Sequence, residues 1–477
     1  MRKEYFRAIT FLFISSFVFI ACEDRNKEGL KEKIENKSVN EWIFSEMDSK
    51  YLYYQDIPAS SSLDYSLEPK DFFASLLSRQ HEMKTMEDGT GYFYSYMETP
   101  ENTKSAYSYS TYGIEFLRYP NPRTPGSQIA RVLYVLKNSP AEKAGIMRGD
   151  FIYKVNNELL NPTNYAILKS GQAATLYKAA YVRNQATGKY EYVQYTDPVN
   201  IAASEAIEDN PIHFSKVFEF DGRKIGYIVY NSFKFGPTDE LVDFRYENEM
   251  RELMKDFKNE GVSDLILDLR YNGGGYLRTA QLLASTIVPE SGLGQLMAIQ
   301  EMNDKQEKLN TEKETNFYPV SGVGGSNLNL NRLVVIGTRF TASASELIIN
   351  CLRPYMTVIH VGGRTEGKNV GSYSIKNSKF PGYKLQPITI KIYNKLHKSD
   401  YRYGFEPDAN NECDEIGSPD PFAAFGSLED VYLKVALRNL GIDLPASIKT
   451  KGQSVESPVL IPKGMGPTNN PKGLIVL

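Results

Sequence analysis

The residues best placed for chemistry are the hydroxyl-bearing side chains between Arg339 and Glu346, where the sequence reads Arg-Phe-Thr-Ala-Ser-Ala-Ser-Glu. The apolar run 333–336 before them predicts a buried strand, and residues 346–352 after them predict a helix. A small-residue turn at this position can present a hydroxyl beside the unpaired N–H groups of the helix start, which can hold an oxyanion. Ser343 is therefore a candidate nucleophile. The alternative is that it only caps the helix.

A serine hydroxyl is a weak nucleophile and needs a base held beside it. Lys368 lies in a glycine-rich loop directly after the predicted strand 357–361, so its side chain could fold inward. Burial would then lower its pKa from about 10.4 toward neutrality. A loop lysine can equally be a solvated surface charge. His360 lies within the apolar strand and is the alternative base, which would make the chain a Ser–His hydrolase of a small ester or amide.

A second glycine-rich turn occurs at residues 271–275, which read Tyr-Asn-Gly-Gly-Gly. It follows a predicted buried strand, 265–270, and precedes a predicted helix, 277–287. The turn lacks the spacing and the Lys-Ser/Thr ending of nucleotide-binding loops. Its glycines would let the backbone approach a substrate closely. The chain also has no HExxH motif or cysteine cluster, and we expect no metal or other cofactor.

A long pattern at residues 138–156, SPA-x-x-AG-I-x-x-GD-x-I-x-x-VN, resembles that of PDZ domains. The resemblance covers about residues 108–200. It implies that backbone N–H groups of one loop hold the C-terminal carboxylate of a peptide, which adds to the domain as an extra strand. The alternative is a small β domain that only packs against its neighbour. The matching loop consists of Tyr112, Gly113, Ile114 and Glu115.

Together these motifs resemble the C-terminal processing peptidases, or tail-specific proteases, of serine peptidase family S41. The PDZ pattern, Asp-Leu-Arg-Tyr-Asn-Gly-Gly at 268–274, Thr-Ala-Ser-Ala-Ser-Glu at 341–346 and Gly-Lys at 367–368 follow in the order of that family. The resemblance spans about residues 40–445. It implies an α/β fold in which a β-rich PDZ domain, inserted or preceding, joins a ClpP/crotonase-like peptidase core.

The resemblance implies a role for each matched residue. Ser343 is the nucleophile, and Lys368 is its general base, 25 residues later (368 − 343). The backbone N–H of Ala344, together with that of Gly273 or Gly274, forms the oxyanion hole. Ser345 is not the matched nucleophile.

Two positions depart from the family pattern. Many relatives carry Gln four residues after the lysine, whereas this chain has Ser372, which we keep as a possible support for the lysine. Some relatives carry Asp eleven residues after the serine, where this chain has Pro354. These departures bear on catalytic efficiency, but both members of the Ser–Lys pair are present in the sequence.

The N-terminus predicts export and a lipid anchor. Residues 1–22 combine a basic start with a short apolar run and end in Phe-Ile-Ala-Cys, which resembles a bacterial lipoprotein signal with Cys22 as the lipidated residue. This predicts an outer-membrane lipoprotein of the cell envelope, facing the periplasm or the cell surface. A disulfide between Cys351 and Cys413 is permitted there and stays open. The net charge of −3 and the absence of a basic stripe argue against a nucleic-acid partner.

The sequence thus predicts a lipoprotein serine endopeptidase whose substrate is a protein or peptide with an exposed C-terminus. The alternative of another class is a non-catalytic PDZ-type peptide-binding lipoprotein that keeps the peptidase fold. The expected domains are a signal peptide at 1–22, a linker at 23–36, a small helical domain at 37–104, a PDZ domain at 105–200, a peptidase core at 201–445 and a tail at 446–477.

Overall fold

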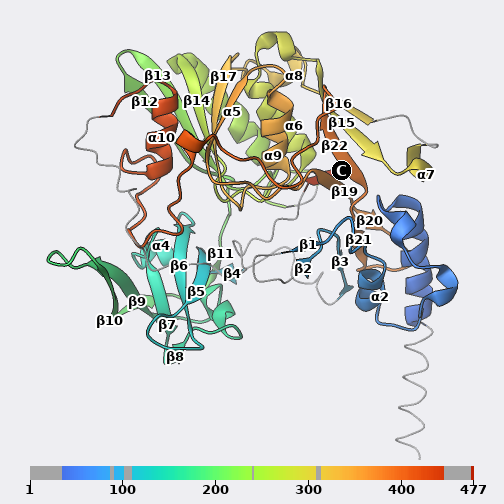
Figure 1. Cartoon of the computed structure of the whole chain (residues 1–477), viewed down its shortest axis with the longest axis horizontal. Helices are drawn as coiled ribbons and strands as arrows, with labels where there is room; N and C mark the ends of the chain where they lie inside the picture. The colour runs from blue at the N-terminus through green and yellow to red at the C-terminus, as the bar shows by residue number, and fades with distance from the viewer. Residues whose placement is uncertain are drawn as a thin grey trace, which may run out of the picture.

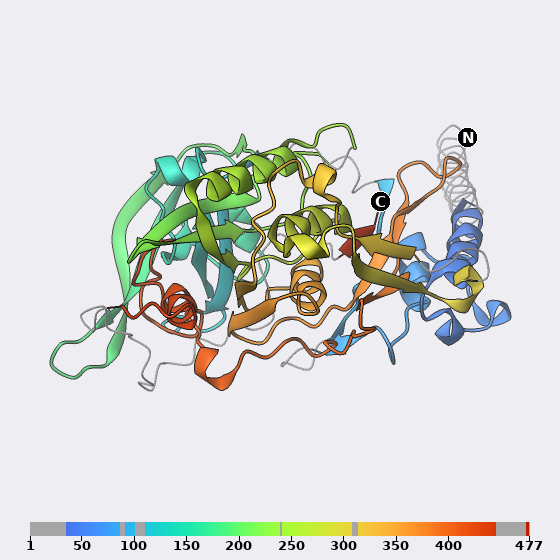
Figure 2. The same cartoon turned by 90° about the horizontal axis from the view of Figure 1, so that it is seen from above.

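The computed structural model shows a mixed α/β core flanked by a β-rich domain and an N-terminal region (Figure 1). In both views the N-terminal helices lie at one end of the molecule, and the β-rich domain lies beside the core toward the other (Figure 2). The structure describes residues 35–85, 91–100, 110–238, 241–307, 313–444 and 474–476. Within these ranges no helix is long and apolar enough to cross a membrane.

The core is built on a five-stranded sheet with the strand order β12-β13-β14-β17-β18. The first pair is antiparallel, and the remaining pairs are parallel. Both faces of the central strands are covered, which explains why their sequences are nearly continuous apolar runs. The strands are β12 (Ile212–Phe220), β13 (Arg223–Tyr230), β14 (Val262–Asp268), β17 (Arg332–Gly337) and β18 (Thr357–Gly362).

Three helices cover one face of this sheet, and a single helix, α10, covers the other. The helix predicted at 277–287 is confirmed as α6, and the one predicted at 346–352 is confirmed with a start two residues earlier. A second sheet, ordered β16-β15-β22-β19-β23, packs against the far side of the three helices. The helices are α5 (Arg245–Glu260), α6 (Leu277–Ile287), α9 (Ala344–Leu352) and α10 (Val431–Asn439), with the short α7 (Asp304–Glu307) and α8 (Val320–Val323). The second sheet consists of β15 (Leu296–Met302), β16 (Lys313–Asn316), β19 (Val370–Tyr373), β22 (Ile390–Asn394) and β23 (Leu474–Val476).

The β-rich domain is a sheet ordered β10-β9-β7-β6-β5, with β8 paired to β7. Its short helix α4 begins where the sequence pattern places Pro, and the Ser139 hydroxyl caps it by accepting from the Glu142 N–H. Strand β5 is the last strand of this sheet. The elements are β5 (Ile114–Pro120), β6 (Gln128–Val135), α4 (Pro140–Lys143), β7 (Phe151–Val155), β8 (Glu158–Leu159), β9 (Ala174–Arg183) and β10 (Tyr190–Ile201), with the pair β4 (Ser110–Thr111) and β11 (Glu205–Ala206) beside it.

The N-terminal region is not the purely helical unit that the sequence predicts. Residues 35–50 are helical, and α2 (Pro69–Ser75) follows, but three strands come after them. The third strand pairs with β21, almost 290 residues later, so the region shares a hydrophobic core with residues 370–388 of the peptidase part. Helical periodicity is local and visible in sequence, whereas this distant pairing is not. The strands are β1 (Lys84–Thr85), β2 (Gly91–Tyr92), β3 (Tyr96–Glu98), β20 (Ile375–Lys376) and β21 (Lys384–Gln386).

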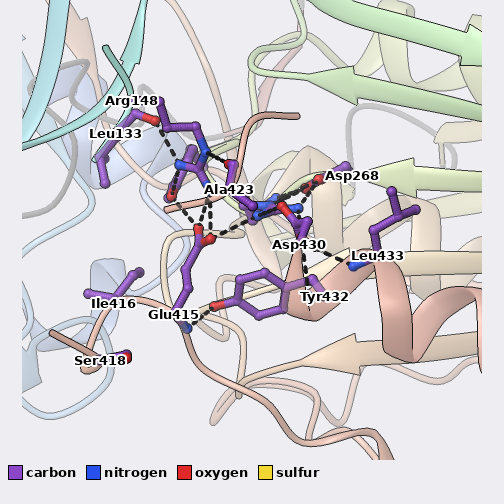
Figure 3. Close-up of polar contacts among 12 residues, drawn as sticks. Leu133, Arg148, Asp268, Glu415, Ile416, Ser418, Ala423, Asp430, Tyr432 and Leu433 are labelled. Atoms are coloured by element: carbon purple, nitrogen blue, oxygen red, sulfur yellow. Dashed lines mark hydrogen bonds and ion pairs between the residues drawn. The ribbon is translucent and has the colours of Figure 1, made fainter. Parts of the chain in front are cut away.

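A buried charge cluster joins the core to the β-rich domain (Figure 3). At its centre Arg270 donates to Asp268 at 2.6 Å, Asp430 at 2.8 Å and Glu415 at 3.2 Å. Arg148, from the β-rich domain, donates to both carboxylate oxygens of Glu415 at 2.6 Å. Burial alone would raise the pKa of Glu415, but the two arginines lower it to about 2. Glu415 is therefore ionised at neutral pH, and its paired, desolvated contacts with Arg148 and Arg270 hold the two domains together.

The same cluster reaches the glycine-rich turn. The Tyr271 hydroxyl donates to Glu415 Oε1 at 2.6 Å and accepts from Arg148 at 2.8 Å. A fully buried arginine of β6, Arg131, donates to the Ser418 carbonyl at 2.6 Å, and its guanidinium lies 3.6 Å from the ring centroid of Phe422. The segment that follows Glu415 is thus fixed against the β-rich domain, and the turn at 271–275 is fixed against that segment.

We expect Arg270→Met to lower the free energy of unfolding by about 3–5 kcal/mol, because it leaves three buried carboxylates around a lost cation. Urea unfolding followed by circular dichroism measures the change. The matched control is Arg245→Met, which removes a half-exposed arginine paired with Asp243 and Glu208. Its urea midpoint should stay at that of the parent chain. Equal midpoints for the two variants would contradict a stabilising role for the cluster.

Candidate active site

The site lies at one edge of the core sheet, where three neighbouring parallel strands end. The turn at 269–276 follows β14, the turn at 338–343 follows β17, and the loop at 363–369 follows β18. Because the carboxyl ends of parallel strands meet at one edge, loops that are distant in sequence converge there. This arrangement brings the glycine-rich turn, the candidate nucleophile and the candidate base into one site.

Ser343 occupies a strained position directly before α9. Its φ is 61° and its ψ is −110°, and a non-glycine residue there stores on the order of 1–3 kcal/mol of strain. The side chain is only 2% exposed. Within the described part of the chain its Oγ has no hydrogen-bond partner. Ser343 and Glu346 thus form a capping box at the start of α9, but the serine Oγ makes no well-formed hydrogen bond there and stays available to react.

The neighbouring hydroxyl groups of the same turn are already committed. Thr341 Oγ1 donates to the Leu269 carbonyl at 2.7 Å, and Ser345 Oγ donates to the Asn272 carbonyl at 2.9 Å. These bonds attach the serine turn to the glycine-rich turn from both sides. Ser343 is thus left as the hydroxyl of this turn that is free to react.

A single carboxylate, Glu346, holds the serine turn and the lysine loop together. Its Oε2 accepts the backbone N–H of Ser343 at 2.9 Å and that of Lys368 at 2.8 Å. Its Oε1 accepts the Gly367 N–H at 2.7 Å and the Thr365 hydroxyl at 2.6 Å. Complete burial raises the pKa of Glu346 to about 7, although all four hydrogen bonds oppose that shift. The backbones of both candidate catalytic residues are therefore anchored on one atom.

The Lys368 side chain is buried, as a role as base requires. It is 4% exposed, and burial lowers its pKa to about 8 against the opposing charges of Glu82, Glu366 and Glu346. Its Nζ lies 4.4 Å from the ring centroid of Tyr94, whose hydroxyl donates to Glu366 at 2.8 Å. The N-terminal region thus supplies part of the cover over the lysine. Because the serine Oγ has no partner in the described ranges, the two side chains are not hydrogen-bonded to each other in this structure.

The glycine-rich turn lies directly against the serine turn. A Cβ added at Gly274 would come within 2.9 Å of Ser343 Cβ and 3.0 Å of the Ala344 nitrogen. The Gly274 N–H donates to Asn272 Oδ1 at 2.9 Å, so it is already used. No acceptor among the described residues takes the N–H of Gly273 or of Ala344. The geometry therefore favours Gly273 over Gly274 as the partner of Ala344 in an oxyanion hole.

The remaining predicted site residues are placed as follows. Ser372 is buried in β19, and its Oγ accepts from Gln386 Nε2 at 2.8 Å, so its contact is with that amide. His360 is buried within β18, and burial lowers its pKa to about 4. Cys351 and Cys413 are free thiols. Cys22 lies outside the described residues. Over those residues no cluster of His, Cys, Asp and Glu could hold a metal ion.

Two backbone N–H groups of the loop proposed for peptide binding already have acceptors within the protein. The Tyr112 N–H donates to the Lys169 carbonyl at 2.9 Å, and the Gly113 N–H donates to a neighbouring threonine hydroxyl at 2.9 Å. Ile114 and Glu115 begin β5 and are buried. Since β5 ends the sheet order, its outer edge is the surface on which an added strand could pair.

Sequence reasoning did not assign roles to Glu346, Asn272 or Tyr94. The first two carried a signal, because Glu346 stands three residues after Ser343, as in a capping box, and Asn272 precedes the paired glycines. Tyr94 carried none, because it reaches the lysine from a region almost 275 residues earlier (368 − 94 = 274).

We expect Glu346→Gln to lower the free energy of unfolding by roughly 2–4 kcal/mol, because an amide cannot accept all four donors and leaves buried N–H groups unpaired. Thermal and urea unfolding measure the loss. Glu252→Gln is the control, since that exposed carboxylate pairs only with Lys255 at the surface. A Glu346→Gln chain as stable as the Glu252→Gln chain would show that the carboxylate does not anchor the two loops.

Comparison with known proteins gives matches over most of the chain. Residues 224–410 match the model of peptidase family S41, and residues 38–109 match that of the peptidase S41 N-terminal domain. The chain is 25% identical to a carboxyl-terminal-processing protease of Picosynechococcus sp. over 314 residues, which is 66% of this chain and 67% of that protein. It is 25% identical to the carboxy-terminal processing protease CtpB of Bacillus subtilis over 343 residues, 69% of this chain and 62% of that protein.

Among solved structures, a Bacteroides fragilis protein assigned to the S41 proteases is 30% identical, with a TM-score of 0.70. That match covers 84% of this chain and 97% of the other. In the present chain the glycine-rich turn, the serine turn and the lysine loop follow one another in the order that the family resemblance implied. The chain therefore belongs to peptidase family S41, the family of carboxyl-terminal processing proteases, and is a serine peptidase of that family.

Proposed function

We propose that this chain is an endopeptidase in which Ser343 and Lys368 form a catalytic dyad. The observation that carries the proposal is that the one unpaired hydroxyl of the serine turn and a buried lysine of lowered pKa are anchored through their backbones to the same Glu346 oxygen. A lysine with a pKa of about 8 is partly neutral at physiological pH and can accept a proton.

The reaction would proceed through an acyl-enzyme. Ser343 Oγ attacks the carbonyl carbon of the scissile peptide bond while its proton passes to the neutral Lys368 Nζ. The N–H groups of Ala344 and Gly273 hold the oxyanion. Lys368 then gives the proton to the leaving amine, takes another from the water that attacks the ester, and returns it to Ser343 Oγ as the acyl bond breaks. For the first transfer, Nζ must move from the face of Tyr94 to within about 3 Å of the hydroxyl, which substrate binding can favour.

We assign the β-rich domain to the PDZ class and infer that it captures the substrate's C-terminal region as a strand on the outer edge of β5, the last strand of its sheet. The sequence pattern at 138–156 and the edge position of β5 support this. Because the N–H groups of Tyr112 and Gly113 are already bonded, the strand edge supplies more of the binding than the loop.

We also propose that the enzyme works in the cell envelope and is tethered there by lipid on Cys22. The support is the signal-like sequence at 1–22 and the polar stretch at 23–36, which could serve as a tether. Metabolic labelling of expressing cells with an azido fatty acid tests this. Incorporation should be lost in the Cys22→Ala chain, and retained incorporation in that chain would contradict the anchor.

Ser343→Ala and Lys368→Ala should each lower kcat/KM on an unfolded protein by about 10³-fold or more, because each removes an obligatory member of the dyad. Exposed residues of the same types provide the controls, Ser60→Ala and Lys376→Ala, which should retain parental activity. A serine-directed phosphonate should label the parent at Ser343. Wild-type turnover in both dyad variants would contradict the assignment. Peptide binding without any labelling would favour the non-catalytic alternative.

The activity should rise with pH through a midpoint near 8 and level off about one pH unit higher, because Lys368 acts only after it loses its proton and burial lowers its pKa to about 8. The pH profile of kcat/KM measures the midpoint. In a Lys368→Arg chain the residual activity should lack this transition, because arginine keeps its proton throughout the range. A midpoint near 10.5, the ordinary value for lysine, would exclude Lys368 as the buried base.

A further inference from the structure

Residues 474–476, which lie in the tail that the sequence places at 446–477, form an ordered strand against the core. Residues Leu474–Val476 are β23, the edge strand of the second sheet, and Figure 1 shows the C-terminus beside β19. The pairing is parallel, with Leu474 opposite Gly371 and Val476 opposite Tyr373. Strand β19 begins two residues after Lys368, so the tail pairs with the strand that leaves the catalytic loop.

The other edge of β23 faces the glycine-rich turn. The Ile475 N–H donates to the Gly275 carbonyl at 3.0 Å, and Ile475 bridges to Tyr276 in parallel. Gly275 directly follows Gly274, which lies against Ser343. The tail is therefore a strand held between two backbone segments, one leaving the lysine loop and the other leaving the turn beside the nucleophile.

The central side chain of this strand fills an aromatic pocket. Ile475 is 3% exposed and packs in one cluster with Phe235 and Tyr276, whose ring centroids are 4.7 Å apart, and with the partly buried Phe244. Residues 474–477 read Leu-Ile-Val-Leu, of which Ile and Val have high strand propensity. The pocket and the two backbone edges together hold an extended strand with an apolar side chain at its centre.

We propose that the slot between β19 and residues 275–276 binds an apolar strand of a substrate beside the bond that is cleaved, separate from the chain end held on β5, and that the chain's own Leu474–Val476 occupies it in cis as a competitor. This inference rests on the proposed function. A tethered strand competes at an effective concentration of the order of millimolar, so it can mask a groove that free peptides would otherwise enter.

The direction of β23 indicates which part of a substrate reaches the dyad. Because Leu474 pairs three residues after Lys368 and Val476 pairs five after it, the amino end of the strand lies nearer the lysine. A substrate bound in the same direction presents the bond on the amino side of its apolar strand. The strand itself then lies on the leaving side of the cleaved bond.

Peptide binding without catalysis tests the inference. In the Ser343→Ala background, a fluorescein-labelled Lys-Gly-Leu-Ile-Val-Leu peptide should bind a chain truncated after residue 473 about 10-fold more tightly than the full chain, as expected if the tail fills the slot nine-tenths of the time. Fluorescence anisotropy gives both affinities. A peptide with Asp in place of Ile should not bind.

A second variant keeps the test independent of how well the truncated chain folds. Ile475→Asp, which expels the tail from the pocket, should reproduce the gain in the full-length chain. Leu396→Asp, the same kind of change at a leucine that is 59% exposed, should not. Equal peptide affinity in the parent, truncated and Ile475→Asp chains would overturn the inference. That result is distinct from failure of the proposed function, which is judged by turnover in the dyad variants with residues 474–477 present.

Discussion

The site depends on one buried carboxylate that is satisfied without a cation. The two Glu346 oxygens accept hydrogen bonds from three backbone N–H groups and one hydroxyl, and these bonds join the serine turn to the lysine loop. A carboxylate bonded directly to the Lys368 ammonium would keep that amine protonated. Here the backbone and the Thr365 hydroxyl take up the carboxylate's acceptor capacity, and burial lowers the pKa of the lysine to about 8 although the charge of Glu346 opposes that shift. The oxygen that positions the backbone of the proposed base thus accepts from that backbone and not from the amine.

Around this contact the fold provides successive layers of positioning. Parallel strands deliver three loops to one edge of the sheet, and Asn272 then ties two of them together, through its carbonyl to the serine turn and through its side chain to Gly274. Farther from the site, Arg270 and Glu415 fix the glycine-rich turn to the segment that follows Glu415. That segment in turn packs against the β-rich domain. A movement of the β-rich domain would therefore shift the glycine-rich turn, because buried ion pairs connect the two.

The ordered chain end gives the site a physical template for its ligand. An added strand there pairs on both edges, so its backbone contributes most of the recognition and its side chains need only be apolar. This suits a peptidase of protein substrates, because backbone pairing is indifferent to most of the sequence. The aromatic pocket at Ile475 adds a preference without demanding a particular residue.

Local patterns in the sequence were sufficient for much of this description. The helix at 277–287 follows from its apolar spacing, and the strands that end near residues 268, 337 and 362 follow from their apolar runs. Family motifs singled out Ser343 and Lys368, and their order also indicated the family. The N-terminal region shows the limit of prediction from local patterns. Strand β3 pairs with the distant β21, and short-range periodicity in the sequence does not indicate that pairing.

By itself, then, the sequence determined which residues can react and which strands and turns carry them, since residue type and short-range periodicity are local properties. Only the tertiary structure decided which hydroxyl is unpaired and that the Gly274 N–H already donates to Asn272. It also decided that Tyr94 covers the lysine and that residues 474–476 lie between β19 and the glycine-rich turn. Those outcomes depend on which distant groups come within hydrogen-bonding and packing range, and burial and pairing are fixed only when the whole chain has folded.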